Sequence, residues 1–429
     1  MNVCIFQKHN RSGDLTHQQK SHLGLLRPNV VAGSCAIAIA MGMARLDFGA
    51  IGRLMVQDHW IKASGIGELA GLSLLAFLLG SIHHTQLRAR STVLRTMFFA
   101  AVLLPLSFWI AVFEADFIGQ AFTRVLAGWS AAHLMSGMPG LALEGAPAML
   151  RRRDSGMVLA GGGFGALIGA FAIGIFAPNS ARGGWIVMAL IATVLTLPVV
   201  WLIRTAKAQN SRPGSSTTPE APIAAAGIKP KPQQRWRVGV LICGGGLLVG
   251  AGQIPICLYA PIVVYERLGG GASLSSESLA VFGLGSAIGA LSAAFLPRHW
   301  PTALILPLVS LIGLLGSVLF LFSNSLSTIL SATLLIGIWM WMTIPLTYDR
   351  LGELGLSTDV HRRVWALMST LAGLGYATFS LSTAGLTSQH LKTVLFLGVL
   401  VIVLQFTMEN LQRIGSAKPG REQLQSQQS

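Results

Sequence analysis

The sequence predicts an all-α polytopic membrane protein, with twelve transmembrane helices arranged as two pseudo-symmetric six-helix bundles. The first observation behind this prediction is composition. Of 429 residues, 52% are hydrophobic and only 11% are charged, and the mean hydropathy is +0.62, which is more apolar sequence than a water-soluble core needs. The second observation is the number of long apolar segments, and the third is a weak internal repeat that relates the two halves of the chain.

Twelve apolar runs of roughly 18 residues or more predict the spanning helices. They are centred near Met41, Ala76, Leu103, Ala131, Gly165, Thr193, Gly252, Ala287, Leu311, Leu335, Ala372 and Val399. A segment such as 304–322 is apolar nearly all round, whereas the strands of a membrane barrel are short and alternate in polarity. The predicted fold is therefore helical, with six spans in each half.

The internal repeat aligns three pairs of segments without gaps. The pairs are residues 40–58 with 248–266, 68–80 with 277–289, and 163–165 with 373–375. Their offsets are 208, 209 and 210, so the register hardly changes, and Gly42 falls on Gly250. Weak symmetry between two hydrophobic halves is typical of secondary carriers. Transport is therefore the leading functional hypothesis.

Polar stretches divide the chain into five predicted parts. They are a cytoplasmic tail (1–27), an N-terminal bundle (28–204), a cytoplasmic linker (205–236), a C-terminal bundle (237–411) and a second cytoplasmic tail (412–429). The linker is rich in Pro, Ser, Thr, Ala and Lys and has no periodic apolar face, as expected of a flexible connection. The first 27 residues are polar and lack a small-residue cleavage site, so we expect no removable signal peptide.

Basic residues are distributed unequally between the two sides of the predicted membrane. The chain carries 31 Lys and Arg against 16 Asp and Glu, a net charge of +15. The outward segments hold only Arg53, Lys62, Arg182, Arg267 and Lys392. By the positive-inside rule, both termini should be cytoplasmic, in an inner membrane. A basic face toward anionic lipid accounts for the net charge, so we expect membrane lipids and no nucleic acid as partners.

The cysteines and glycines predict neither a metal site nor a cofactor. The four cysteines show no paired spacing, so they are interpreted as small apolar residues. Two GxGxxxG runs differ from the dinucleotide fingerprint and follow no strand, and small residues let membrane helices approach closely. The predicted packing glycines are Gly42, Gly49, Gly128, Gly161, Gly165, Gly169, Gly285 and Gly289. With no catalytic motif in the sequence, we predict that the protein is not an enzyme.

Three charged residues lie within predicted spans: Arg45 and Asp47 in the first and Arg124 in the fourth. A charge at the bilayer centre costs about 2.5–3.5 kcal/mol on insertion scales, so such groups are functional candidates by default. Two residues correspond to about 200° on an α-helix. We therefore predict that Arg45 faces a cavity, on the same face as Gly42 and Gly49, and that Asp47 faces other helices, with Arg124 as one partner. A purely structural Asp47–Arg124 ion pair is an equal alternative.

The residues around these charges resemble a known family. Arg124 is followed by Gly128 and Ala132, which resembles the fourth helix of the major facilitator superfamily. The segment 42–48, Gly-Met-Ala-Arg-Leu-Asp-Phe, is similar to the first-helix GxxR-aromatic signature of its YbfB/YjiJ-type branch. The resemblance covers both predicted bundles. It implies a twelve-helix secondary carrier, with a site near the bilayer midplane that opens alternately to either side.

Departures from the family pattern limit what the resemblance implies. Asp47 is an extra charge in the signature. The acidic-basic loop between the second and third helices is reduced to His83, His84 and basic residues, without its Asp. The Gly-Pro element of the antiporter motif is absent, since Ala166 follows Gly165. These departures weaken a drug-efflux interpretation.

Three further polar residues complete the predicted site. His133 could relay protons or be a hydrogen-bonded packing residue. Gln253 aligns with Arg45 in the repeat and could bind substrate or join helices. Trp339 and Trp341 are two residues apart, so at most one should line the cavity, and Trp339 is the predicted substrate contact.

The predicted function is transport of a small molecule, with Arg45 attracting an anionic or polar group and protonation of Asp47 linked to the movement. A protein of this architecture should act as a monomer. The alternatives are a non-transporting receptor or scaffold on a carrier fold and a channel. The first would need a folded cytoplasmic partner domain and the second a continuous polar lining, and the sequence offers little of either.

Overall fold

The computed structural model describes residues 27–210 and 236–414, apart from gaps at 114–115, 148–149, 178, 237–238, 242, 258–259, 270–271, 298–299, 355–357 and 385–389. The predicted tails 1–27 and 412–429 lie outside these ranges except for Arg27 and residues 412–414. Most of the predicted linker, residues 211–235, also lies outside them.

The N-terminal half begins with three consecutive helical segments, α2 (Pro28–Ile37), the π-helix η1 (Ala38–Leu46) and α3 (Phe48–Gln57). Five long helices follow: α4 (Ala63–Gln86), α5 (Arg90–Ala111), α6 (Phe117–Ala142), α7 (Arg151–Phe176) and α8 (Ala181–Asn210). Local sequence explains several starts. Pro28 occupies the first turn of α2, where no backbone N–H is needed, and the Asp116 carboxylate caps α6 by accepting from the Gly119 N–H at 2.9 Å.

The C-terminal half begins in the same interrupted way. After the helical residues 236 and 239–241, it contains the π-helix η2 (Cys243–Leu248), α10 (Val249–Gly252), α11 (Ile254–Cys257) and α12 (Ala260–Leu268). The long helices α13 (Ala272–Phe295), α14 (Thr302–Phe322), α15 (Leu326–Glu353), α16 (Thr358–Ala384) and α17 (Leu391–Ile414) follow. A capping box between Ser325 and Thr328 starts α15.

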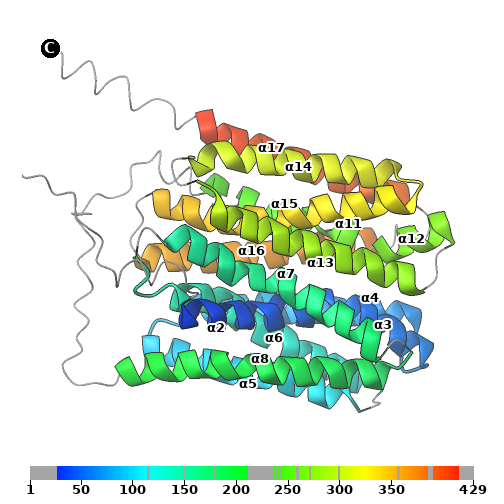
Figure 1. Cartoon of the computed structure of the whole chain (residues 1–429), viewed down its shortest axis with the longest axis horizontal. Helices are drawn as coiled ribbons and strands as arrows, with labels where there is room; N and C mark the ends of the chain where they lie inside the picture. The colour runs from blue at the N-terminus through cyan, green and yellow to red at the C-terminus, as the bar shows by residue number, and fades with distance from the viewer. Residues whose placement is uncertain are drawn as a thin grey trace, which may run out of the picture.

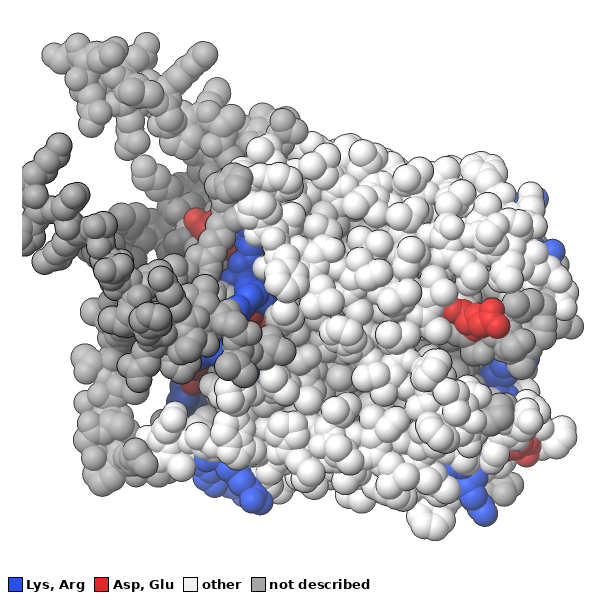
Figure 2. All heavy atoms as spheres, in the orientation of Figure 1, with Lys and Arg blue, Asp and Glu red and all other residues white. Residues whose placement is uncertain are grey.

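The described part of the chain is an all-helical membrane protein without strands. Ten of its helical segments are long and apolar enough to cross a bilayer, and each of the twelve predicted centres falls within a helix. The helix α6, which carries Gln120, Arg124 and His133, is not among the ten. Figure 2 shows a broad uncharged band, with Lys, Arg, Asp and Glu concentrated toward the two ends of the long axis.

Helix packing follows the same pattern in both halves. In the N-terminal half α4 packs on α6, α5 on α6 and α8, and η1 on α7. In the C-terminal half the corresponding pairs are α13 with α15, α14 with α15 and α17, and η2 with α16. The start of α2, the end of α8 and the end of α17 all lie at the left end of the molecule in Figure 1. The sequence repeat is thus accompanied by a repeat of helix contacts.

Two helix pairs make most of the contacts between the halves, α7 with α13 and α4 with α16. The contact between α7 and α13 is close because it is made by glycine. A Cβ atom on Gly163 would lie 2.3 Å from the Ala287 backbone nitrogen, and one on Gly156 would lie 2.6 Å from the Ala294 Cβ. The two halves therefore meet backbone to backbone along one of these pairs.

The repeated glycines make equivalent contacts. A Cβ atom on Gly165 of α7 would lie 2.3 Å from the Ala38 carbonyl oxygen, and one on its counterpart Gly375 of α16 would lie 2.0 Å from the Leu247 carbonyl oxygen. On the facing segments, a Cβ atom on Gly42 would lie 2.5 Å from the Ala166 nitrogen of α7, and one on its counterpart Gly250 would lie 2.1 Å from the Ala372 carbonyl oxygen of α16. The repeat therefore preserves the positions at which two helix backbones touch.

Candidate functional site

The π-helix η1 sets the directions of the Arg45 and Asp47 side chains. The Asp47 N–H donates to the Gly42 carbonyl at 3.2 Å, a five-residue hydrogen bond that places Asp47 one turn beyond Gly42. Both residues consequently face α7, where a Gly42 Cβ would lie 2.5 Å from the Ala166 nitrogen. This differs from the sequence-based expectation that Gly42 shares the Arg45 face, because that expectation assumed a regular α-helix.

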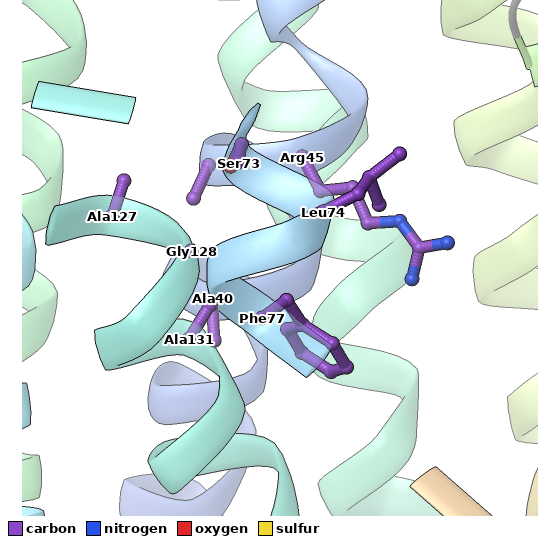
Figure 3. Close-up of a pocket in the computed structure, with 9 residues that line it drawn as sticks. Ala40, Arg45, Ser73, Leu74, Phe77, Ala127, Gly128 and Ala131 are labelled. Atoms are coloured by element: carbon purple, nitrogen blue, oxygen red, sulfur yellow. The ribbon is translucent and has the colours of Figure 1, made fainter. Parts of the chain in front are cut away.

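Arg45 lies on the other side of η1, toward α4 and α16. It lines a small pocket between η1, α4 and α6 (Figure 3) whose other residues are Ala40, Ala44, Ser73, Leu74, Phe77, Ala127, Gly128 and Ala131. Its guanidinium carbon lies 6.0 Å from the centre of the Phe77 ring and 4.2 Å from that of Tyr376. Since Phe77 is on α4 and Tyr376 on α16, Arg45 lies where the two halves meet.

Two donors of the Arg45 guanidinium remain unused. Its Nε and Nη2 atoms are buried and have no hydrogen-bond partner among the described residues. An unpaired buried donor costs about 1–3 kcal/mol, and more when it is charged. The two rings supply cation–π attraction, but they accept no N–H group in the way a carboxylate does. The arrangement is suited to an anion that would accept both hydrogen bonds.

Asp47 is placed inside the N-terminal half. Its Oδ2 atom is buried, without a hydrogen-bond partner in the described part of the chain. It occupies the space left by Gly169 of α7, where a Cβ would lie only 1.7 Å from that oxygen, and Met188 of α8 is beside it. The absent side chain of Gly169 therefore makes room for this carboxylate.

Arg124 occupies an aromatic cage instead of an ion pair. Its guanidinium carbon lies 4.8 Å from the centre of the Phe48 ring, 5.9 Å from that of Phe108 and 4.6 Å from that of Trp185. Among the described residues, no ion pair joins Arg124 to Asp47. The π-helix turns Asp47 toward α7, whereas the adjacent Phe48 side chain faces Arg124, so the predicted ion pair does not form.

His133 of α6 contacts two histidines of α4. Its Nε2 lies 3.2 Å from His83 Nδ1, and its Nδ1 lies 3.1 Å from His84 Nδ1. Trp129 packs against the His133 ring with their centres 4.3 Å apart. The predicted relay candidate therefore belongs to a hydrogen-bonded row of three imidazoles.

The predicted contacts of the C-terminal half occupy different environments. Gln253 lies at the break between α10 and α11, where its amide donates to the Val249 carbonyl at 3.2 Å and its Oε1 is buried without a partner among the described residues. Trp339 packs inside its own half, against Gly313 and Gly252. Trp341 instead crosses to α7, where a Gly162 Cβ would lie 1.8 Å from its ring. Trp341 is thus the tryptophan at the junction of the halves.

The predicted packing glycines differ in how tightly they are enclosed. Five would place a Cβ 2.0–2.3 Å from a carbonyl oxygen of a neighbouring helix: Gly128, Gly161, Gly165, Gly285 and Gly289. Gly42 meets α7 as described above, and Gly169 meets a side chain. Gly49 is loosely packed, since its nearest neighbour is a Leu279 methyl carbon at 3.7 Å.

An ion-pair cluster joins the halves at the end where α7 begins. Arg152 of α7 contacts Asp349 of α15 at 2.8 Å and Glu353 at 3.4 Å. It also donates to the Pro297 carbonyl, just beyond α13, at 3.1 Å. Glu353 is shared with Arg350 at 2.8 Å. We call this group of Arg152, Asp349, Glu353 and Arg350 the inner clamp.

Sequence reasoning missed several residues of the site. Phe77 and Tyr376 look like ordinary core aromatics, and only their position across the interface makes them ring partners of Arg45. His83 and His84 had a detectable signal, because adjacent histidines at a helix end are uncommon in an apolar segment. The family resemblance implies a loop position for them, whereas both lie within α4. No group of described residues is arranged to hold a metal ion.

Comparison with known proteins gives one family match, which covers most of the chain. A family model described as uncharacterised MFS-type transporter YbfB matches residues 37–408, which confirms the predicted resemblance. No curated protein matches the chain.

Proposed function

Because the chain belongs to this family of MFS-type transporters, we propose that it is a secondary active carrier that moves a small organic anion by alternating access. The observation that carries the proposal is Arg45. Its guanidinium has two buried donors without a partner in the described residues, and it lies between Phe77 of one half and Tyr376 of the other. An anion bound there would contact both halves. A substrate of an alternating-access carrier needs such contacts, because its site lies between the two halves.

The proposed architecture is twelve spans in two six-helix bundles. Its support is the matching set of helix contacts in the two halves and the equivalent glycine contacts of Gly165 and Gly375. The α6 helix would be the fourth span, and the segments from η2 to α12 would form the seventh. Basic residues favour the end that holds the inner clamp as the cytoplasmic end. Both termini would then be cytoplasmic, in the inner membrane, and the protein would act as a monomer.

Alternating access would require the inner clamp to open. Arg152 reaches from the N-terminal half to two carboxylates of the C-terminal half, so these contacts must break when the halves separate at this end. The rocking of one bundle against the other would then expose Arg45 to the cytoplasm. The clamp residues are thus proposed to favour the inward-closed state.

Ion coupling is the remaining part of the proposal. Asp47 is a carboxylate inside the membrane with an unpartnered oxygen, and such groups are typical proton carriers of transporters. Protonation of Asp47 would neutralise the carboxylate and so remove the free-energy cost of burying its charge. If an Asp47→Asn variant transports with unchanged pH dependence, Asp47 has no proton role.

A thermal-shift screen of the purified protein against small organic anions tests the proposed binding site. An anion at 100 times its Kd should stabilise the folded protein by about 2.7 kcal/mol. Arg45→Ala should abolish this stabilisation, whereas Arg53→Ala, which removes a charge from α3 of the same segment, should retain it. Equal stabilisation of the Arg45→Ala variant and the parent would exclude Arg45 as the anchor.

The rival function is a receptor or scaffold on a carrier fold. It shares the predicted anion binding, so binding alone does not separate the two. Counterflow separates the two functions, because only a carrier moves its binding site back across the membrane with substrate bound. An anion that stabilises the parent but never shows counterflow would favour the receptor.

A further inference from the structure

We propose that His83, His133 and His84 form a proton-binding chain, in which three hydrogen-bonded imidazoles share one proton and pass it between the end of α4 and the interior beside the Arg45 pocket. The chain is built by two helices. Adjacent histidines of α4 contact opposite edges of the single histidine of α6, at 3.2 Å and 3.1 Å. Because His133 offers its two nitrogens to different neighbours, the rings form a row and do not converge on one point. This geometry suits a proton and not a metal ion.

Hydrogen-bonding rules limit the proton count. A neutral imidazole has one donor and one acceptor nitrogen, whereas the charged form has two donors. A neutral row is satisfied when His83 donates to His133 and His133 donates to His84. One added proton on His133 lets it donate to both neighbours. A second added proton would place donors face to face at 3.1–3.2 Å, so the row holds one.

The same arrangement allows the proton to move along the row. A proton that arrives at His83 Nε2 releases the Nδ1 proton of His83 to His133 Nε2. The Nδ1 proton of His133 then passes to His84 Nδ1, and His84 releases its Nε2 proton. Each ring gains and loses one proton, so the row ends neutral with its hydrogen bonds reversed.

Exposure gives the row a direction. His83 is exposed, whereas His84 is 5% exposed and His133 is fully buried. His133 lies two residues from Ala131, and His84 lies seven residues from Phe77, and both of these neighbours line the Arg45 pocket. A proton that the row delivers to His84 therefore arrives about two helical turns along α4 from Phe77 of the proposed anion site.

The titratable groups around the row come from several helices. The hydrogen-bonding and charged neighbours of His133 in the described part of the chain are His83 and His84. His84 has an additional interaction besides its contact with His133. The His84 ring and Met97 of α5 both lie next to Gly137. The other titratable groups with described side chains on α4, α6 and the segments packed against them are Cys35, Arg45, Asp47, Arg53, Glu68, Arg90, Arg95, Arg124, Arg151, Arg152, Arg153, Asp154, His361, Arg363 and Tyr376.

Trp129 provides a direct readout of the row. Its ring is centred 4.3 Å from His133 and 6.1 Å from His83, and a charged imidazole at such a distance quenches indole fluorescence. We expect the full-length protein in lipid nanodiscs to lose fluorescence in one step as the pH is lowered and the row takes up its proton. Trp129→Phe should remove that step.

Three histidine variants test the assignment. His133→Asn should abolish the Trp129 step, and His390→Gln, an exposed histidine just before α17, should leave it unchanged. His83→Leu should move the step to lower pH, because the charged His133 ring loses an acceptor. It changes an exposed residue, so it remains informative if His133→Asn does not fold. A step that is absent from the parent, or that keeps its amplitude in His133→Asn, overturns the proposal.

Proton binding by the row does not depend on transport, whereas its role as a coupling site rests on the proposed function. The fluorescence titration needs no substrate. If the titration succeeds and no anion shows counterflow, the proton site stands and the carrier proposal fails. If counterflow succeeds and the titration shows no Trp129 step, the carrier stands without this proton site.

Discussion

The Asp47 carboxylate occupies the space beside Gly169 that a larger side chain at position 169 would need. A Cβ on Gly169 would lie 1.7 Å from the Asp47 Oδ2. We expect Gly169→Ala to destabilise the protein by about 1–3 kcal/mol, the usual cost of overpacking, as measured by thermal unfolding in detergent. Gly49→Ala is the matched control, since its nearest neighbour at 3.7 Å leaves room for a methyl group.

A second substitution separates this contact from a general loss of packing. Adding Asp47→Ala to Gly169→Ala removes the oxygen that the new methyl group meets. The double variant should recover at least half of the stability lost by Gly169→Ala. If the two substitutions simply add, the carboxylate does not occupy that space.

At the residue scale the sequence identified the buried charges but not their partners. Arg45, Asp47 and Arg124 stand out because charges are rare in apolar segments. Their partners depend on a five-residue hydrogen bond at Gly42, which no periodicity in the sequence reveals. The opposite directions of Arg45 and Asp47 were predictable, whereas the separation of Asp47 from Arg124 was not.

The glycine contacts of α7 and α16 are the element-scale features that repeat most closely. Gly165→Ala and Gly375→Ala would each drive a methyl group into a backbone carbonyl, 2.3 Å and 2.0 Å away. Both variants should lower the thermal unfolding temperature, by similar amounts. Gly174→Ala on α7, which has nothing within 4 Å, should be neutral or stabilising by up to about 1 kcal/mol, because alanine favours helix. A stability loss restricted to one of the two helices would contradict their equivalence.

At the element scale the sequence predicted the positions of the helices well. Every predicted centre falls in a helix because an apolar run long enough to cross a bilayer leaves the backbone few alternatives. The irregular segments η1 and η2 were not predicted, since a π-helix differs from an α-helix in hydrogen-bond register and not in composition. The end of α8 at Asn210, beyond the predicted bundle limit of 204, reflects a helix that continues past its apolar run.

The inner clamp makes a prediction about the whole molecule. Arg152→Glu should repel Asp349 and Glu353 and so favour opening at this end. In a variant without native cysteines, Ser286→Cys at the buried α7–α13 junction should then react faster with a maleimide. A shift of 1 kcal/mol would raise the rate about fivefold.

Two controls show whether this change comes from the clamp. Arg90→Glu breaks an exposed ion pair with Glu144 within the N-terminal half and should not alter the labelling rate. Asp349→Arg added to Arg152→Glu should restore slow labelling. Unchanged labelling in Arg152→Glu would mean that the clamp does not hold the halves together.

At the scale of the molecule the sequence predicted two related halves but not how they meet. The repeat survives in the glycines because backbone contacts tolerate no side chain. The contacts of Arg152 with Asp349 and of Arg45 with Tyr376 join positions far apart in the chain. Neither follows a local pattern, so only the assembled helices reveal them.

The central claim is that Arg45 binds an anion which the two halves carry across the membrane, and counterflow in proteoliposomes tests it most directly. The anion is the one that stabilises the parent in the thermal-shift screen. Internal anion should accelerate uptake of the external labelled anion by the parent and by Arg53→Ala, and Arg45→Ala should show no acceleration. Binding without counterflow in the parent, or undiminished counterflow in Arg45→Ala, would contradict the account.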